Sequence, residues 1–75
     1  MPKLPVIKAS ELISALEQAG FSIHRQSRGC HIMMTHSDGR MTIVPNHKGR
    51  DVPNGTLMAI LRDIGLSKED FVASL

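Results

Sequence analysis

The 75-residue chain contains no tryptophan, no tyrosine, only two phenylalanines and a single cysteine, Cys30. One cysteine excludes an internal disulfide, which fits a reducing compartment. No apolar run approaches the roughly 20 residues that a membrane-spanning helix needs. The first residues also lack the apolar segment of a signal peptide. These absences predict a soluble, cytoplasmic protein without a membrane anchor.

The scarcity of aromatic residues means that the core must consist of leucine, isoleucine, valine and the five methionines. Methionine fills irregular gaps, so we expect core positions for Met33, Met34, Met41 and Met58. With 41% apolar residues the composition is that of a globular protein, and 75 residues predict one domain, residues 1–75. This length is near the lower limit for an unaided core.

Acidic residues are nearly absent from the middle of the chain. Residues 24–50 contain five basic residues and one acidic residue, a net charge of +4, whereas the rest contains four basic and six acidic residues, or −2. All four histidines lie in this basic segment, at His24, His31, His36 and His47. A basic stripe of this kind is suited to bind phosphate, although a solvated hairpin surface has the same composition.

Helical spacing of apolar residues predicts a first helix that Ser10 caps and Gly20 ends. A second helix is predicted at residues 55–64, with Asn54 or Thr56 as its cap and Gly65 after its end. A short third helix should begin at Ser67. Three of its residues should pack back on the core, namely Phe71, Val72 and Leu75.

Alternating apolar and polar residues predict strands at residues 21–26, 30–35 and 41–44, with Asp38-Gly39 as a hairpin turn. In the first strand the alternation places Arg25 on the same side as Phe21 and Ile23. The order of helices and strands predicts an α+β fold, a three-stranded antiparallel sheet with helices on one face. The other face is left for a ligand.

His31 is the histidine best placed for chemistry. In its strand the more apolar side, with Cys30, Ile32 and Met34, should be buried. His31 should lie on the accessible side near Arg25 and Arg28. Histidine ordinarily titrates near about pH 6.5, so it can accept and return a proton at neutral pH. RNA supplies its own nucleophile, the 2′-hydroxyl beside the scissile phosphate. The position of His31 in the strand pattern, taken alone, is more typical of a surface histidine than of a catalytic one.

The loop at residues 45–50 offers further phosphate contacts. Gly49 permits close approach of a ligand to the backbone, and Lys48 and Arg50 can bind phosphate as a point charge and as a planar fork. A charged, solvated loop is an equal explanation. His36 and Asp38 are expected to satisfy backbone groups of the hairpin turn.

A zinc site would use the same residues differently. Cys30, His31, His36 and His47 offer one thiolate and three imidazoles, enough for tetrahedral zinc. Their spacing matches no standard zinc pattern, and the first two point to opposite faces of a strand. Cys30 as a nucleophile has no recognisable catalytic partners, and a cysteine on an apolar face is more often inert.

Four ordered segments carry a family resemblance. They are Gly29-Cys30-His31, His36-Ser37-Asp38-Gly39-Arg40, Val44-Pro45-Asn46-His47-Lys48-Gly49-Arg50 and Gly55-Thr56-Leu57-Met58-Ala59-Ile60-Leu61. They are similar to the Gly-Ser-His, His-Pro-Asp-Gly, Val-Pro-x-His-x-Gly-Lys and Gly-Thr-Leu-x-x-Ile-Leu motifs of the HicA toxins, also described as YcfA-like proteins. The resemblance extends from about Ile7 to Phe71.

The resemblance implies a fold like the double-stranded-RNA-binding domain, in the order α-β-β-β-α. It also implies a toxin that blocks translation by cleaving mRNA, without a metal or other cofactor, and that is inhibited by a HicB-like antitoxin covering the active face. The catalytic histidine of the family falls on His31. We expect Arg28, Gly29, Lys48 and Arg50 to contact the RNA.

Two positions depart from the family pattern. Cys30 replaces a serine, which keeps a small side chain but weakens hydrogen-bond donation. Met34 stands where the family often has an aromatic residue. They motivate a second hypothesis, a non-catalytic RNA-binding module of the same fold that reads duplex shape and phosphates. The hairpin zinc protein is the third.

Overall fold

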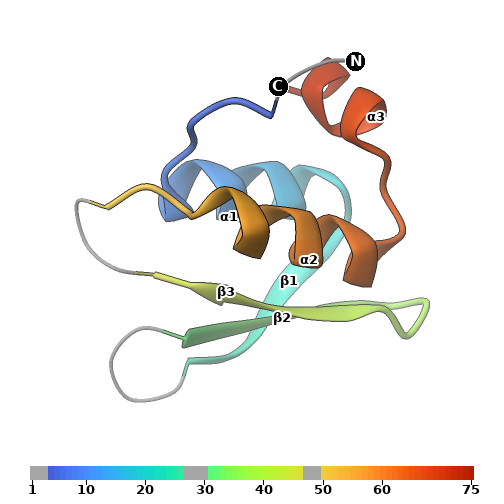
Figure 1. Ribbon diagram of the computed structural model, residues 1–75. Helices are drawn as coiled ribbons and strands as arrows, with labels where there is room; N and C mark the ends of the chain where they lie inside the picture. Colours follow the sequence, from blue (N-terminus) through green and yellow to red (C-terminus); the bar gives the residue numbers. More distant parts are fainter. Residues whose placement is uncertain (1–3, 27–30, 47–49) are drawn as a thin grey trace.

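The computed structural model describes residues 4–26, 31–46 and 50–75. Its elements are α1 (Ala9–Gln18), β1 (Phe21–Gln26), β2 (His31–His36), β3 (Met41–Pro45), α2 (Asn54–Ile64) and α3 (Lys68–Ala73). The strands form one antiparallel sheet in the order β1-β2-β3. Figure 1 shows α1 and α2 on the same side of the sheet, and no described helix covers the other side. The predicted α+β order, like that of a double-stranded-RNA-binding domain, is confirmed.

The predicted caps of the first two helices are wrong. The N-cap of α1 is Lys8, whose N–H donates to Glu11 Oε1 at 3.1 Å, so that Ser10 lies inside the helix. The reason is tertiary, because Lys8 is held in an antiparallel bridge with Asp51 and the helix begins directly after it. The N-cap of α2 is Pro53, whose carbonyl accepts the N–H of Leu57 at 2.9 Å. Asn54 and Thr56 therefore lie within α2.

The predicted helix ends and the third cap are confirmed. Gly20 follows α1 with a φ of 99°, and Gly65 follows α2 in the left-handed region with a φ of 71°. Ser67 Oγ accepts the N–H of Asp70 at 3.1 Å and so caps α3. These signals depend on a few neighbouring residues, which is why the sequence is sufficient to find them.

The core lies between the helices and one face of the sheet. Buried apolar side chains come from every element, among them Leu12, Leu16, Phe21, Ile32, Met34, Val44, Leu57, Ile60, Leu61, Ile64 and Phe71. Four of them, Leu57, Ile60, Leu61 and Ile64, recur at helical spacing and form the buried face of α2. Leu75, expected in the core, is 58% exposed because α3 ends at Ala73, before it. Met34 is fully buried, so its difference from the family pattern affects core packing and not the surface.

The other methionines do not behave as predicted. Met33 is only half-buried, and Met41 and Met58 are 48% and 37% exposed. In β3 the buried residues are Thr42 and Val44, so the alternation of the strand turns Met41 away from the helices. The expectation that these three fill the core is wrong. The face of the sheet opposite to the helices is thus partly apolar.

A β-bulge changes the direction of β1. Ile23 pairs with Met34, but the next pair is Arg25 with Met33, so β1 has one extra residue in this interval. Directly paired residues share a face of the sheet, and Met33 and Met34 lie on opposite faces. Arg25 is therefore on the face away from the helices. The predicted grouping of Arg25 with Phe21 and Ile23 is wrong because of this bulge.

Candidate active site

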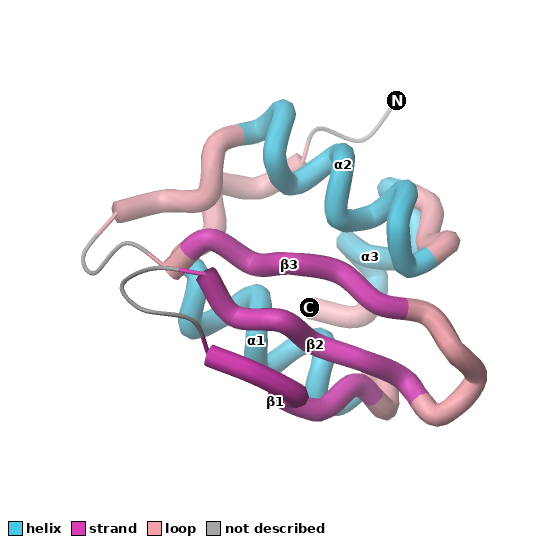
Figure 2. Tube along the Cα trace, turned by 90° about the horizontal axis from the view of Figure 1, so that it is seen from below, coloured by secondary structure: helices cyan, strands magenta, loops and turns pink. Residues whose placement is uncertain are grey.

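The face of the sheet away from the helices, called the open face below, is seen in Figure 2 with all three strands in front of the helices. Its described side chains, placed by strand register and alternation, are Ser22, Arg25, His31, Met33, Thr35, Met41, Ile43 and Pro45. None of them is a carboxylate. The described acidic residues lie on the helices, in the β2–β3 turn and at Asp51. The open face is therefore suited to a negatively charged ligand.

His31 begins β2 on the open face. Its neighbour Ile32 is 4% exposed and Met34 is fully buried, while His31 is exposed on the opposite side of the strand. The predicted orientation is confirmed. His31 pairs with Pro45, so the chain enters β2 and leaves β3 at the same end of the sheet.

A hollow of about 80 Å³ lies beside this histidine, lined by Arg25, His31, Met33 and Ile43. All three strands contribute to it, with the pairs Arg25–Met33 and Met33–Ile43 running across the sheet. The β-bulge is essential to this arrangement, because it turns the guanidinium of Arg25 onto the same face as the imidazole. Sequence reasoning missed Met33 and Ile43 as site residues, although the alternation of β3 could have placed Ile43 outside the core.

Most of the predicted RNA contacts lie outside the described residues, namely Arg28, Gly29 and Lys48, together with Cys30 and His47. Arg50 is described and exposed. It directly precedes Asp51, which pairs with Lys8, and it does not line the hollow beside His31. Of the two arginines that the sequence predicts near His31, the structure describes Arg25, and both side chains line the same hollow.

His36, at the other end of β2, has a different environment. The N–H of Asp38 donates to His36 Nδ1 at 3.1 Å, and the imidazole meets the ring of Phe21 edge-on at 5.1 Å between centroids. A Cβ atom placed on Gly20 would lie 2.8 Å from His36 Nε2, so the histidine packs directly against the α1–β1 turn. The prediction that His36 satisfies turn backbone groups is confirmed.

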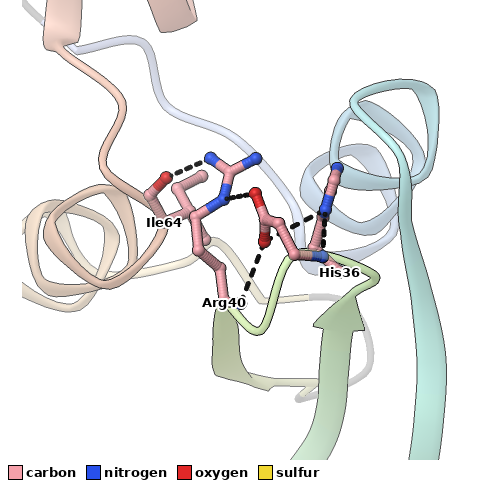
Figure 3. A network of polar contacts seen from close by, with 4 residues as sticks. His36, Arg40 and Ile64 are labelled. Carbon is pink, nitrogen blue, oxygen red and sulfur yellow. Dashed lines mark hydrogen bonds and ion pairs between the residues drawn. The ribbon is translucent and has the colours of Figure 1, made fainter.

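Asp38 and Arg40 complete this arrangement, and we refer to His36, Asp38 and Arg40 as the turn clasp (Figure 3). Arg40 Nε donates to Asp38 Oδ2 at 2.7 Å, and Arg40 Nη1 donates to the carbonyl oxygen of Ile64 at 2.6 Å. The Arg40 N–H also donates to Asp38 Oδ1 at 3.0 Å. This backbone hydrogen bond, with the Arg40 side chain and the nearby His36, holds the pKa of the Asp38 carboxyl below its ordinary value. The clasp ties the hairpin turn to the end of α2.

The two described histidines of the zinc hypothesis cannot share one ion. His31 and His36 lie at opposite ends of β2, about 16 Å apart at the usual rise of 3.3 Å per residue. Zinc ligands lie about 2 Å from the metal, so such a separation excludes a common site. Within residues 4–26, 31–46 and 50–75, no three histidine, cysteine or acidic residues are grouped to hold a metal.

A protein-family model matches a part of the chain that includes the whole sheet. A model described as the HicA toxin of bacterial toxin–antitoxin systems matches residues 9–66. The chain belongs to the HicA toxin family. It is therefore the toxin of a toxin–antitoxin system, which implies an antitoxin as its partner. The matched region runs from α1 to just beyond α2 and contains His31, the hollow and the turn clasp.

No curated protein matches the chain. No helix in the described part of the chain is long and apolar enough to cross a membrane.

Proposed function

We propose that this HicA-family toxin is a metal-independent endoribonuclease that cleaves mRNA, with His31 as its general acid–base residue. The observation that carries the proposal is the position of His31, exposed beside Arg25 on a sheet face without described carboxylates. Cleavage of mRNA in the cytoplasm would block translation and so account for toxicity.

The chemistry requires one proton acceptor, one proton donor and a cation. An imidazole at His31 can take the proton of the RNA 2′-hydroxyl, whose oxygen then attacks the neighbouring phosphorus. The bond from phosphorus to the 5′-oxygen breaks, that oxygen takes a proton from the His31 imidazolium or from water, and a 2′,3′-cyclic phosphate remains. The guanidinium of Arg25 would stabilise the added negative charge on the phosphoryl oxygens. No metal is needed because the nucleophile belongs to the substrate.

The RNA backbone should extend beyond the hollow to other basic residues of the middle segment. We propose that Arg28, Gly29, Lys48 and Arg50 bind it. The first three lie within three residues of His31 or Pro45 in sequence, and these two residues pair at one end of the sheet. Such phosphate contacts make binding strongly dependent on salt concentration. The same basic, carboxylate-free face is suited to an acidic HicB-like antitoxin, which would inhibit the toxin by covering it.

The proposal is tested by RNA cleavage with purified protein in excess chelator. We expect His31→Ala to reduce the rate by at least about 100-fold, the lower range for general acid–base catalysis. His24→Ala is a matched control, because His24 is also an exposed histidine of the sheet but does not line the hollow. Both variants should melt at the temperature of the wild type.

Two results would contradict the proposal. Cleavage by His31→Ala at the wild-type rate would remove the catalytic role of this histidine. Salt-sensitive RNA binding by the wild type without any cleavage would favour the non-catalytic RNA-binding module. Growth arrest on expression of wild type, His24→Ala and His31→Ala gives an independent comparison in cells.

A further inference from the structure

The open face has no large aromatic ring on which a base could stack. The chain lacks tryptophan and tyrosine, and its phenylalanines, Phe21 and Phe71, are only 4% and 1% exposed. Proteins that bind single-stranded RNA usually hold bases on exposed aromatic rings or on arginine guanidinium planes. A ribonuclease with this composition must therefore hold the base beside the scissile phosphate with other side chains.

The hollow beside His31 supplies such side chains. Its floor is the cross-strand pair Met33–Ile43, and Arg25 and His31 add a cation and an imidazole. Its volume is about 80 Å³, well below the roughly 300–1,000 Å³ of pockets that enclose a whole small molecule. A flat ring can therefore lie against its floor, but the hollow is too small to enclose a nucleotide with its sugar and phosphate. The sugar and phosphate would therefore stay at the surface, close to His31.

Each lining side chain has a known affinity for aromatic rings. Thioether sulfur makes favourable contacts with aromatic rings, a guanidinium stacks on them, and an isoleucine side chain offers apolar area. Ile43 is 47% exposed, so its apolar surface is available for such a contact. Arg25 can serve the base and the neighbouring phosphate together, since both lie on the open face.

We propose that Met33 and Ile43, with Arg25, form a seat for the nucleobase next to the phosphate on which His31 acts. This inference rests on the proposed function and adds the residues that hold the substrate. The side chains of Met33 and Ile43 donate no hydrogen bonds, so the floor of the seat recognises a ring surface and not the pattern of a particular base. Cleavage should therefore depend on the presence of a base more than on its identity.

The test measures binding of a short, single-stranded 2′-fluoro oligoribonucleotide, which lacks the 2′-hydroxyl and cannot be cleaved. A series of the same oligonucleotide carries one abasic residue at each position in turn. For the wild type, we expect one abasic position to weaken binding by about five- to ten-fold, the lower end of the loss caused by removing a stacked base. Ile43→Ala and Met33→Ala should weaken binding of the intact oligonucleotide by a similar factor and show no further loss at that abasic position.

Met41→Ala is the matched control. Met41 is 48% exposed, close to the 47% of Ile43, and lies two residues away on the same face of β3, but it does not line the hollow. The Met41→Ala variant should bind the intact oligonucleotide and the abasic series with the affinities of the wild type. Equal binding of the intact oligonucleotide by Ile43→Ala and wild type would overturn the proposal and favour a protein partner as the ligand of the hollow. Persistent discrimination against the abasic position by both seat variants would also overturn it.

The outcome is independent of the catalytic test, because the oligonucleotide cannot be cleaved. If His31→Ala still cleaves RNA but the abasic effect depends on Ile43, the proposed mechanism fails and the seat stands. If His31 is essential but no abasic position matters, the mechanism stands and the seat fails.

Discussion

The two ends of β2 carry the same residue type in opposite situations. His31 begins the strand on the open face, exposed beside a shallow hollow and a guanidinium. His36 ends it, and accepts a backbone hydrogen bond, meets the edge of a phenylalanine and packs on the α1–β1 turn. Both histidines belong to segments that resemble HicA motifs, but only His31 is accessible to a large substrate.

The difference shows how a small domain divides its histidines between structure and chemistry. In the turn clasp, the contacts of His36 and Arg40 join three distant segments. His36 lies against Gly20, and Arg40 ties the hairpin turn to Ile64 (Figure 3). The His31 end lies where the chain enters β2 and leaves β3, on a face that no described helix covers. Removing His36 should therefore affect stability, and removing His31 should affect activity.

The largest stability effect should come from Gly20→Ala. Gly20 has a φ of 99°, which strains any residue with a Cβ, and that Cβ would lie 2.8 Å from His36 Nε2. We expect a loss of at least about 2 kcal/mol, or roughly 8 °C or more in melting temperature for a domain of this size.

Gly39→Ala separates the two causes. Gly39 has the same φ of 99°, but a Cβ placed on it would meet no described atom within 4 Å. Gly39→Ala should therefore lower the free energy of unfolding only through backbone strain, by about 1 kcal/mol.

A double mutant tests the contact between Gly20 and His36. In a His36→Ala background the imidazole is absent, so Gly20→Ala should lower the free energy of unfolding by less than it does in the wild type. An equal loss of unfolding free energy in both backgrounds would show that a Cβ at position 20 does not clash with the His36 imidazole.

The next effect in size is that of His36→Ala, with about 1 kcal/mol lost in thermal or urea unfolding. The variant removes the acceptor for the Asp38 N–H and the edge-on contact with Phe21. RNA cleavage measured well below the melting temperature should stay within about two-fold of the wild type. A large loss of cleavage in a folded His36→Ala protein would break the distinction between the two ends of β2.

The smallest effect concerns Asp38 and appears only in acid. Because the pKa of Asp38 is lowered in the folded protein, its carboxylate stabilises the fold above the unfolded-state pKa, near about 3.9. That contribution is lost as the pH falls below about 4 and through the folded-state pKa. The melting temperatures of wild type and Asp38→Asn should therefore converge between about pH 5 and pH 2. Parallel melting curves over this range would show that the carboxylate has no such role.

The sequence by itself determined the order of the elements and most of the core. The apolar face of α2, the end at Gly65 and the cap at Ser67 follow from periodicity and from short-range backbone hydrogen bonds. The exposed side of β2 at His31 follows from simple alternation. These features depend on neighbours within a few residues, so a single chain without its fold contains the information needed to find them.

Only the tertiary structure decided how the site is assembled. The extra residue in β1 turned Arg25 to the face of His31, and pairing across three strands placed Ile43 beside them. Likewise, the bridge with Asp51 places the N-cap of α1 at Lys8. His36 packs against Gly20, and Arg40 donates a hydrogen bond to the carbonyl oxygen of Ile64. Each of these depends on contacts between residues far apart in the chain, where neither periodicity nor capping rules apply.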